Sequence, residues 1–490
     1  MKAKSLWLLL FLIGYASQVT ALTAQARPAG RSTALGKRVV VYTTADSTPL
    51  RLAPTDTLLF KAAEPITEAQ IYVFVDPRRT FQTMIGIGGA LTDAAAETFA
   101  KLPAARQEDV MTAYYSPERG IGYTLGRTNI NSCDFSSDMY TYVTEGDTTL
   151  SSFAIAHDLH YKIPLIKRAM AATGTRGGLK LFASPWSPPA YMKDNNDMLH
   201  GGHLRAEYRQ TWALYYTKFI ESYRRAGVPV WGITIQNEQM ATQTWESCIY
   251  QPEAERDFLR DYLGPVMARR GLKDVNIIVW DHNRDLIVQR AQAIFDDRRA
   301  AQYAWGIGFH WYEDWSGGTQ MYDNVALVNR LYPAKHIIFT EGTPASFDST
   351  AYGRWSLGEA YGRSMIHDFN SGAEGWTDWN ILLDEKGGPN HVGNYCFAPI
   401  HADTRTGTLI YTNSYYYIGH FSKFIRPGAR RIAVAPSRSM FLTTGFVNPN
   451  GSVAIVVMNP TGRAGEYHIR VGDAAVTVRS PAHSIQTVTF

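Results

Sequence analysis

The stretch Trp231–Met240, with the sequence WGITIQNEQM, joins a strand pattern to a carboxylate. Its first six residues alternate between apolar and small or polar side chains, as in a β-strand. Asn237 and Glu238 follow directly. A carboxylate at this position is either the buried partner of a cation or part of a functional site, and the surrounding sequence decides between these two readings.

Seven other segments share this pattern of a short apolar run, and amphipathic stretches such as Tyr208–Gly227 separate them. In chain order the eight predicted strands are MIGIGGALTD (84–93), YTLGRTNI (123–130), LKLFASPW (179–186), WGITIQNE (231–238), NIIVWDH (276–282), WGIGFHWY (305–312), HIIFTE (336–341) and GWTDWN (375–380). Eightfold alternation of strand and helix predicts an α/β fold, a (β/α)8 barrel. The alternative is an open, doubly wound sheet.

Polar or aromatic side chains that can take part in chemistry end nearly every predicted strand. They are Asp93, Arg127, Trp186, Glu238, Asp281 with His282, His310 with Trp311, Glu341, and Trp379. An open sheet draws its site from one switch point, whereas a barrel gathers the carboxyl ends of all its strands at one mouth. The distribution therefore favours the barrel.

Segments with period-two alternation flank this region. They are RVVVYTTADS, PLRLAP and AQIYVFVD before it and SVAIVVMN, EYHIRVG, AVTVRS and SIQTVTF after it. Neither flank has enough strands to be stable alone, so we expect both to pair into one β-sandwich. The predicted organisation is a signal peptide at 1–24, sandwich strands at 35–80, the barrel at 81–417 and further sandwich strands at 418–490.

The first residues predict export. Lys2 and Lys4 precede the apolar run Leu6–Ala16 and then small residues, which is typical of a secretory signal peptide. The run is too short to span a membrane, and no later segment comes close, so we expect a secreted or periplasmic protein without an integral membrane segment.

Composition bounds the class of protein further. Apolar residues make up 45% of the 490-residue chain, which is typical of a globular protein, and 48 basic against 44 acidic residues leave a net charge of only +4. This balance indicates no nucleic-acid partner. Aromatic residues reach 12%, which suits a large core or a site that stacks on sugar rings. Only three cysteines are present, so at most one disulfide can form.

Glu238 and Glu341 are the leading catalytic candidates. They lie 341 − 238 = 103 residues apart, or about 34 per βα unit over three units, close to the ~31 of a 250-residue barrel. This spacing assigns them to the fourth and seventh strands. Cleavage of a glycosidic bond needs one protonated carboxyl to donate to the leaving oxygen and one carboxylate to meet the charge at the anomeric carbon. The competing interpretation is a pair of buried structural glutamates bound to Arg127 or another cation.

A family resemblance rests on longer motifs. GIGGALTDAAAETFA, GRTNINSCDFS, FASPWSPPAYMK, TIQNE, GFHWY, TEG, GWTDWNILLDEKGGPN and IGHFSKFIRPGA occur in order between about residues 80 and 431. They resemble glycoside hydrolase family 30, the group that contains the glucosylceramidases. The resemblance implies a (β/α)8 barrel with an attached β-sandwich and a retaining hydrolase that cleaves β-D-glucosyl linkages without a metal or other cofactor. The implied substrate is a β-glucoside, either a glycolipid or a β-glucan.

The resemblance also implies residue roles. Glu238 matches the general acid/base and Glu341 the nucleophile, so we expect a raised pKa at Glu238 and an ionised Glu341 beside Arg127. Asn237 is expected to bind the sugar's 2-hydroxyl. Positions that match the family's glucose-binding and site-lining residues are Asp134, Trp186, Trp379, Asn394, Arg127, His310, Trp311 and Tyr312.

One residue departs from the family pattern. The family commonly has Pro after the acid/base, where this chain has Gln239. Gln239 restores a backbone donor and offers an amide to the leaving-group side of the site. Shortly after it, Trp245 is either a platform for the leaving group or a packing residue.

Three rival functions remain at this point. The nearest is an endo-β-1,6-glucanase of the same family, which differs in the room left by the loops around DNNDMLHGGH and TWESCIY. Another is a non-catalytic glycan-binding protein, against which both glutamates argue. The third is a metal-dependent hydrolase using Asp281, His282 and His310, which lack the short ligand spacing typical of metal sites.

Overall fold

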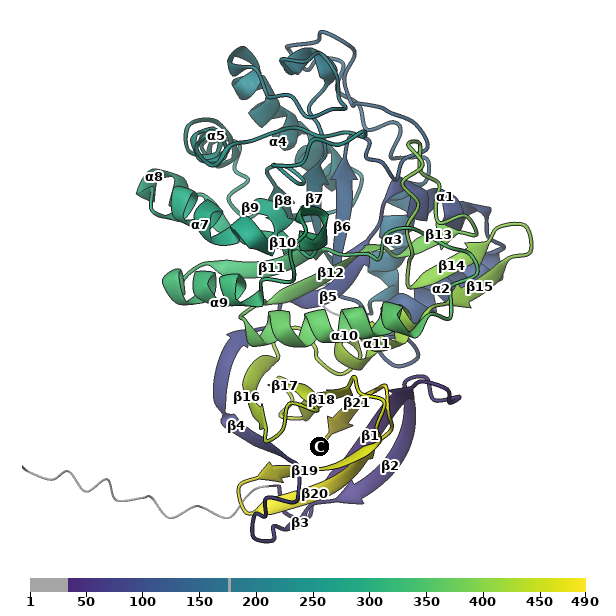
Figure 1. Ribbon diagram of the computed structural model, residues 1–490. Helices are drawn as coiled ribbons and strands as arrows, with labels where there is room; N and C mark the ends of the chain where they lie inside the picture. Colours follow the sequence, from purple (N-terminus) through teal and green to yellow (C-terminus); the bar gives the residue numbers. More distant parts are fainter. Residues whose placement is uncertain (1–33, 175–177) are drawn as a thin grey trace, which may run out of the picture.

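The computed structural model describes residues 34–174 and 178–490. The predicted signal peptide, residues 1–24, lies outside them. The described chain forms two parts, an eight-stranded barrel and a β-sandwich packed against one side of it (Figure 1).

The barrel consists of eight parallel strands in the order of the sequence. They are β5 (Gly86–Ala90), β6 (Leu125–Ile130), β7 (Lys180–Pro185), β8 (Val230–Thr234), β9 (Asn276–Asn283), β10 (Ala304–His310), β11 (His336–Glu341) and β12 (Gly375–Asn380). Strand β5 pairs with both β6 and β12, so the sheet closes and has no edge. The predicted (β/α)8 barrel is confirmed, and the open sheet is wrong.

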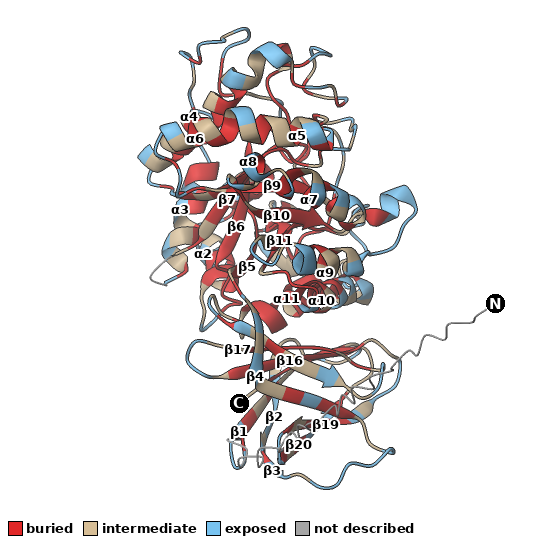
Figure 2. Cartoon of the chain, turned by 90° about the vertical axis from the view of Figure 1, so that its left-hand side faces the viewer, coloured by how far each residue is buried: buried red, intermediate tan, exposed pale blue. Residues whose placement is uncertain are grey.

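Helices surround the barrel. They are α1 (Asp93–Lys101), α2 (Ala104–Tyr115), α3 (Lys162–Ala172), α4 (Arg209–Arg225), α5 (Pro252–Phe258), α6 (Gly264–Arg269), α7 (Ile287–Phe295), α8 (Arg298–Ala301), α9 (Tyr322–Leu331), α10 (Trp355–Asn370) and α11 (Asn413–Ser422). Figure 2 shows that the barrel strands are almost entirely buried, whereas exposed residues lie on the outer faces of the helices.

Helix α4 illustrates how the sequence pattern sets this packing. Its aromatic residues recur at three-to-four spacing, and Trp212, Tyr216, Phe219 and Tyr223 are fully buried. The helix ends just before Gly227, whose φ of 83° is the left-handed conformation that glycine favours at a helix C-terminus. The apolar face therefore determines which side of α4 packs against the barrel, and Gly227 determines where the helix ends.

Apolar side chains fill the interior of the barrel. Leu125, Phe182, Ile278 and Ile338 form a buried layer contributed by four strands. At Gly88 in β5, a Cβ atom would lie 1.5 Å from the carbonyl oxygen of Leu125, so only glycine permits this close strand approach. Because the interior is packed, polar chemistry is restricted to the open C-terminal end.

The sandwich is one ten-stranded sheet that folds over on itself. Its members are β1 (Arg38–Ala45), β2 (Ala53–Leu59), β3 (Lys61–Ala62), β4 (Tyr72–Thr83), β16 (Arg430–Pro436), β17 (Leu442–Val447), β18 (Val453–Asn459), β19 (Gly465–Val471), β20 (Ala474–Ser480) and β21 (Ser484–Thr489). Strand β1 pairs with β21, and β4 lies between β16 and β19. The prediction that both ends of the chain build one sandwich is confirmed.

A separate apolar core holds the sandwich together, with members such as Val41, Ile455 and Ile469 from distant strands of the sheet. Helix α11 joins this part to the barrel. Both ring nitrogens of the buried His420 lie 2.9 Å from a threonine hydroxyl, one of Thr487 and the other of Thr44. Figure 1 shows α10 and α11 between the two parts.

A small sheet of β13 (Leu382–Asp384), β14 (Ile400–Asp403) and β15 (Thr408–Tyr411) extends from the barrel's eighth strand. Cys133, Cys248 and Cys396 are buried free thiols.

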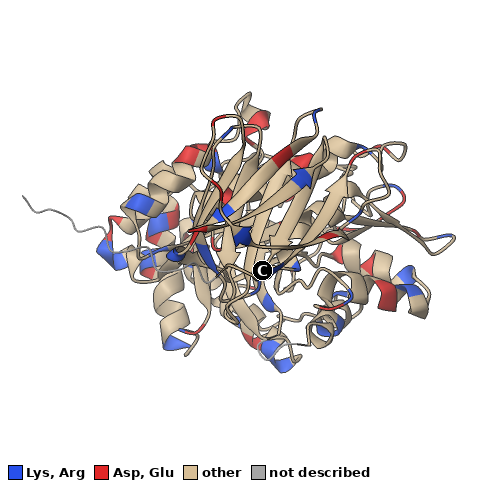
Figure 3. Ribbon diagram, turned by 90° about the horizontal axis from the view of Figure 1, so that it is seen from below, with Lys and Arg blue, Asp and Glu red and all other residues tan. Residues whose placement is uncertain are grey.

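Among the helices of the described residues, none combines the length and apolar character needed to cross a membrane. Lys and Arg are intermixed with Asp and Glu in the view from the sandwich side (Figure 3), consistent with the small net charge.

Candidate active site

A cavity of about 350 Å³ opens at the C-terminal end of the barrel. Eight of the residues predicted from sequence line it, namely Asp134, Trp186, Asn237, Glu238, Tyr312, Glu341, Trp379 and Asn394. His282, noted in the sequence as a strand end, and Trp245, noted as a possible platform, also line it. The structure adds Ala241, Thr242, Gln243, Asn283, Asp285, Trp315, Ser316, Thr343, Ala345 and Cys396. Most of the added residues come from loops after the fourth, fifth, sixth and seventh strands, whose course no strand pattern predicts.

Glu341 is the last residue of β11 and is held from two sides. Arg127 Nη1 donates to its Oε2, and the Tyr312 hydroxyl donates to its Oε1 at 2.9 Å. The other end of the same guanidinium donates to Asn237 Oδ1 at 2.8 Å. These contacts fix the direction of the Glu341 carboxylate and tie it to the neighbouring Asn237.

Glu238 lies four residues beyond the end of β8, in a tight turn with a φ of 48°. Its backbone N–H donates to the carbonyl of Asp281 at 3.0 Å. Its Oε1 lies 3.4 Å from His310 Nδ1 and 3.9 Å from His282 Nδ1. Glu238 therefore shares the cavity with Glu341 but has imidazole neighbours in place of a guanidinium.

Asp281 is the buried centre beneath both glutamates. Its Oδ2 accepts hydrogen bonds from Arg127 Nη2 at 2.9 Å, Ser184 at 3.0 Å and Thr234 at 2.7 Å. Its Oδ1 lies 3.0 Å from His310 Nε2. The charge of Arg127 and the hydrogen bond with His310 hold the pKa of Asp281 far below its ordinary value despite burial. The sequence identified Asp281 as a strand end and as a ligand of the rival metal site, whereas the structure makes it the anion that positions Arg127 and His310.

The pKa values of the two glutamates run opposite to the sequence-based expectation. Burial raises the pKa of Glu341, against the opposing charges of His310 and Arg127. Burial also works against the ionised form of Glu238, but the hydrogen bond with His310 and the charge of His282 lower its pKa. The expected raised pKa of Glu238 is therefore wrong in this structure, because the sequence did not reveal how close the two imidazoles lie.

His310 holds the proton that Glu238 lacks. Burial alone would lower the pKa of His310, but Glu341, Asp281 and Glu238 raise it to about 9. At neutral pH the protonated ring donates to Asp281 and faces Glu238 Oε1. The ring nitrogen Nδ1, which carries a transferable proton, therefore lies 3.4 Å from Oε1 of the acid/base candidate.

Aromatic and polar groups form the far wall of the cavity. Trp186 and Trp379 stack with ring centroids 5.2 Å apart and an interplanar angle of 26°. Asn394 Nδ2 donates to Asp134 Oδ2 at 3.0 Å. Burial raises the pKa of Asp134 well above its usual range. Flat apolar rings beside fixed polar groups suit the faces and hydroxyls of a sugar.

Trp311 is set apart from the other predicted residues. Its side chain does not line the cavity. Its indole packs instead on Phe339, Tyr361 and Trp376. Its Nε1 donates to the carbonyl of Thr343 at 3.4 Å. Trp311 therefore supports the cavity from behind. Arg127 and His310 likewise lie below the cavity and act on it through the carboxylates.

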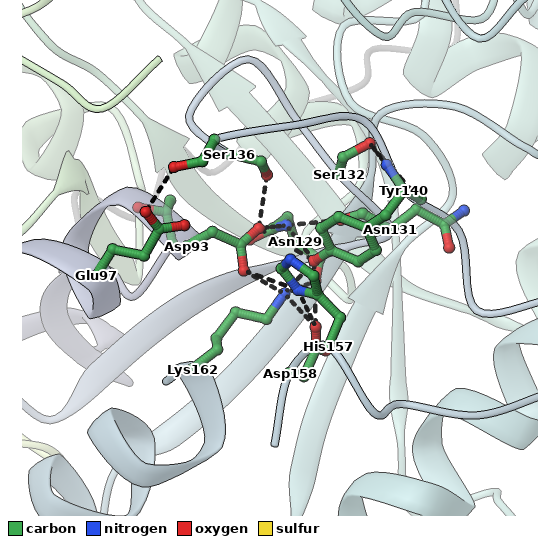
Figure 4. Close-up of polar contacts among 12 residues, drawn as sticks. Asp93, Glu97, Asn129, Asn131, Ser132, Ser136, Tyr140, His157, Asp158 and Lys162 are labelled. Carbon is green, nitrogen blue, oxygen red and sulfur yellow. Dashed lines mark hydrogen bonds and ion pairs between the residues drawn. The ribbon is translucent and has the colours of Figure 1, made fainter. Parts of the chain in front are cut away.

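Asp93 ends the first predicted strand but belongs to a different cluster, shown in Figure 4. Its Oδ2 accepts hydrogen bonds from Ser136 Oγ at 2.6 Å and from Tyr140 OH at 3.0 Å, and Lys162 Nζ lies 3.3 Å from its Oδ1. The cluster anchors the loop that carries Asp134. The expectation that every strand end joins the barrel mouth is wrong for Asp93, because these partners hold its side chain outside the cavity.

Gln239 is turned away from the cavity. Its Nε2 donates to Glu255 Oε1 at 2.7 Å, and its Oε1 accepts from Arg290 Nη1 at 2.8 Å. The side chain is fully buried. The expectation that its amide faces the leaving group is wrong, because the left-handed turn at Glu238 directs the next side chain into the protein. By contrast, Trp245 lines the cavity and is half-buried.

One group of side chains has the geometry of a metal-binding set. It consists of Glu238, His282 and His310, whose possible ligand atoms all lie within 4.8 Å of one another. A metal ligand must be unprotonated, yet the pKa of His310 is raised to about 9 and its nitrogens face two carboxylates. The set is therefore better suited to holding a proton than a cation.

Replacing His310 with Gln is expected to flatten the pH dependence of stability between about pH 6.5 and 9. His310 has a native pKa of about 9 against an ordinary value of 6.5, so its contribution of about 3 kcal/mol is complete below pH 6.5 and is lost as the pH rises through 9. Thermal melting of wild type and variant at pH steps measures this slope.

The matched control for that measurement is His420→Gln. Burial lowers the pKa of His420 to about 3, so this ring is neutral in the native state throughout the same pH range. His420→Gln should lower stability evenly and leave the slope unchanged. Parallel loss of stability in wild type and His310→Gln across pH 6.5–9 would contradict the assigned protonation of His310.

Two glutamates facing one cavity at the mouth of a (β/α)8 barrel, with stacked indoles on its wall, are the features of an enzyme that hydrolyses glycosidic bonds. Comparison with known families agrees. Residues 84–425 match the glycosyl hydrolase family 30 TIM-barrel domain, and residues 428–488 match the family 30 beta sandwich domain. The chain belongs to glycosyl hydrolase family 30 and is a glycoside hydrolase. A purely glycan-binding role without catalysis is therefore set aside.

Known relatives cover nearly the whole chain. Lysosomal acid glucosylceramidase of Mus musculus is 34% identical over 86% of this chain and 84% of its own length. SrfJ from Salmonella typhimurium superposes with a TM-score of 0.87 at 33% identity, covering 93% of this chain and 99% of SrfJ. The endo-β1,6-glucanase BT3312 gives a TM-score of 0.82 at 26% identity, over 92% and 99% of the two chains.

Proposed function

We propose that this protein is a retaining β-glucosidase with glucosylceramidase-like specificity, which removes a terminal β-D-glucosyl group by double displacement. Glu341 is the nucleophile and Glu238 the general acid/base. The observation that supports these roles most strongly is the difference between the surroundings of the two glutamates. Glu341 is hydrogen-bonded to the guanidinium of Arg127 and the phenol of Tyr312. Glu238 lies beside the imidazole of His310, which carries a proton.

In the first step, a Glu341 oxygen attacks the anomeric carbon while the bond from that carbon to the leaving oxygen breaks. Glu238 donates its proton to the leaving oxygen, and a glucosyl ester with Glu341 forms. Arg127 and Tyr312 aim the attacking carboxylate, and the charge of Arg127 favours its ionised form. Asn237, fixed by Arg127, is positioned for the sugar's 2-hydroxyl.

Glu238 must be protonated at that moment, and His310 is the source of the proton. Substrate binding removes water from the cavity, which raises the cost of keeping Glu238 ionised. Transfer of the proton from His310 over 3.4 Å then leaves a neutral acid beside a neutral imidazole. Asp281 holds the ring in place through its other nitrogen.

In the second step, Glu238 accepts a proton from water as that water attacks the anomeric carbon. The bond to Glu341 breaks and β-glucose is released. The proton that Glu238 took from water then returns to His310, which restores the starting state. Two inversions give net retention, which proton NMR of the first-formed product can establish with any soluble β-glucoside.

A product analysis tests the substrate class. Glucosylceramide in detergent micelles and a linear β-1,6-glucan are incubated with equal amounts of enzyme, and the released sugars are separated. Release of glucose from glucosylceramide, with little shortening of the polymer, supports the proposal. Rapid release of gentio-oligosaccharides from the glucan, with glucosylceramide untouched, contradicts it.

A second candidate is an endo-β-1,6-glucanase, which that outcome would support. The observation that favours it is the cavity mouth, where Thr242, Gln243 and Asp285 offer hydrogen bonds and Trp245 and Trp315 offer flat faces. The Trp315 side chain is 70% exposed and could stack on a further sugar unit. The structural likeness to an endo-β1,6-glucanase adds to this case.

We also propose that the protein acts outside the cytoplasm, either secreted or in the periplasm. The support is the sequence of residues 1–24, with its two early lysines, short apolar run and small residues. Fractionation of cells that express the full chain, with mass spectrometry of the mature N-terminus, tests this directly.

A further inference from the structure

Two left-handed stretches of backbone meet behind the acid/base. Glu238 has a φ of 48°, and the consecutive residues Trp280 and Asp281 have φ values of 73° and 63°. Non-glycine residues adopt this conformation only where their surroundings enforce it. The register between β9 and β10 shifts at the same place, which makes Asp281 the extra residue of a bulge.

The two stretches are joined by one backbone hydrogen bond. The N–H of Glu238 donates to the carbonyl of Asp281 at 3.0 Å. The bulge therefore orients two groups of Asp281. It directs the carboxylate towards Arg127 and His310, and it directs the backbone carbonyl of Asp281 towards the turn that carries Glu238. Any movement of the bulge relative to the turn would shift Glu238 relative to the sugar.

A buried network braces both stretches from the side opposite the cavity. Glu255 Oε1, on α5, accepts a hydrogen bond from the backbone N–H of Trp280 at 2.8 Å and one from Gln239 Nε2 at 2.7 Å. One carboxylate oxygen thus contacts the bulge and the residue after the acid/base.

Arg290 on α7 completes the network. Its Nη1 contacts Gln239 Oε1 at 2.8 Å, Glu255 Oε2 at 2.9 Å and the carbonyl of Tyr250 at 3.0 Å. Its guanidinium also lies over the Trp280 ring, 4.6 Å from the centroid. Gln239, Glu255 and Arg290 are at most 1% exposed.

We propose that Gln239, Glu255 and Arg290 form a positioning network that holds the acid/base Glu238 at the angle required for proton donation. Gln239 is the link between the catalytic turn and two helices outside the barrel. The proposal rests on the acid/base role of Glu238 and extends it to residues that touch neither substrate nor the reacting atoms.

The effect of losing this network should depend on the leaving group. A poor leaving group such as an alkoxide needs the proton from Glu238, whereas a dinitrophenolate leaves without it. Misplacing Glu238 therefore slows cleavage of an alkyl glucoside and spares the first step with a dinitrophenyl glucoside. A general loss of folded enzyme would lower both rates by the same factor.

Gln239→Met tests this, since methionine has a similar length and cannot form the hydrogen bonds. We expect kcat/KM to fall about 10- to 100-fold for an alkyl β-glucoside and less than about 3-fold for 2,4-dinitrophenyl β-glucoside. The matched control is Gln486→Met in the sandwich, where a buried glutamine makes three side-chain hydrogen bonds, against two at Gln239. The control should lower thermal stability and leave the ratio of the two kcat/KM values unchanged.

A second pair of variants shows whether misfolding explains the result with Gln239→Met. Arg290→Lys keeps a charge and donors at this position and should retain a ratio near that of wild type, whereas Arg290→Met should reproduce the Gln239→Met ratio. Equal losses on both substrates in Gln239→Met and Arg290→Met would overturn the proposal, as would unchanged ratios in both. Glu238→Ala, measured in parallel, tests the underlying role separately, because it changes the ratio only if Glu238 is the acid.

Discussion

Replacing Glu341 with Gly is expected to reduce hydrolysis of every β-glucoside by about 10⁵-fold or more, because no glucosyl ester can form. The leaving group should make no difference, since the nucleophile is needed for all substrates. The fold should survive, because Arg127 keeps its contacts with Asp281 and Asn237. Initial rates on dinitrophenyl and alkyl glucosides, with a thermal melt, measure both effects.

Two further measurements identify Glu341 as the attacked residue. A 2-deoxy-2-fluoro-β-glucoside with a good leaving group should label wild-type enzyme at Glu341, as shown by peptide mass spectrometry. Azide added to Glu341→Gly, with dinitrophenyl β-glucoside, should give the α-glucosyl azide by one inversion. Substantial activity in Glu341→Gly without azide, or labelling at another residue, would rule out the assigned role.

Replacing Glu238 with Ala is expected to lower kcat/KM for alkyl β-glucosides by about 10²- to 10⁴-fold, the usual contribution of general acid catalysis. Dinitrophenyl β-glucoside should still form the covalent intermediate quickly, because its leaving group needs no proton. The intermediate should then accumulate, since no base activates water. A burst of dinitrophenolate followed by a slow steady rate is the expected signature.

Azide separates this variant from Glu341→Gly. It should restore turnover in Glu238→Ala and yield the β-glucosyl azide, because attack on the ester is a second inversion. An α product from this variant would show that the two roles are exchanged. Equal loss on good and poor leaving groups would mean that Glu238 does not act as an acid.

Much of the fold could be predicted because its determinants are local. Each barrel strand is a short apolar run, and Trp212, Tyr216 and Phe219 mark the buried face of α4 at helical spacing. The period-two flanks contain too few strands to stand alone, which requires β1 and β21 to meet in one sheet. These patterns report which faces must avoid water, and burial of those faces dominates the stability of the fold.

The site could be predicted only in part. Glu238 and Glu341 were recognisable because a carboxylate after an apolar strand stands out from its surroundings. The direction of Gln239, the separate cluster around Asp93 and the position of Trp311 behind the cavity were not recognisable. Each depends on partners more than 15 residues away in the chain, and strand and helix periodicity contains no information about them.

The sequence by itself determined the class of fold, the strands that deliver each glutamate and the pairing of both chain ends in one sandwich, because these follow from the spacing of apolar residues. Only the tertiary structure decided where the proton resides. His310 acquires a pKa of about 9 because Glu341, Asp281 and Glu238 surround it after folding. The stretch Trp231–Met240 ends in a left-handed turn that is held by the bulge at Asp281 and braced through Gln239. Contacts of this kind exist only once distant segments are packed together, so the packed barrel determined the chemistry of the site.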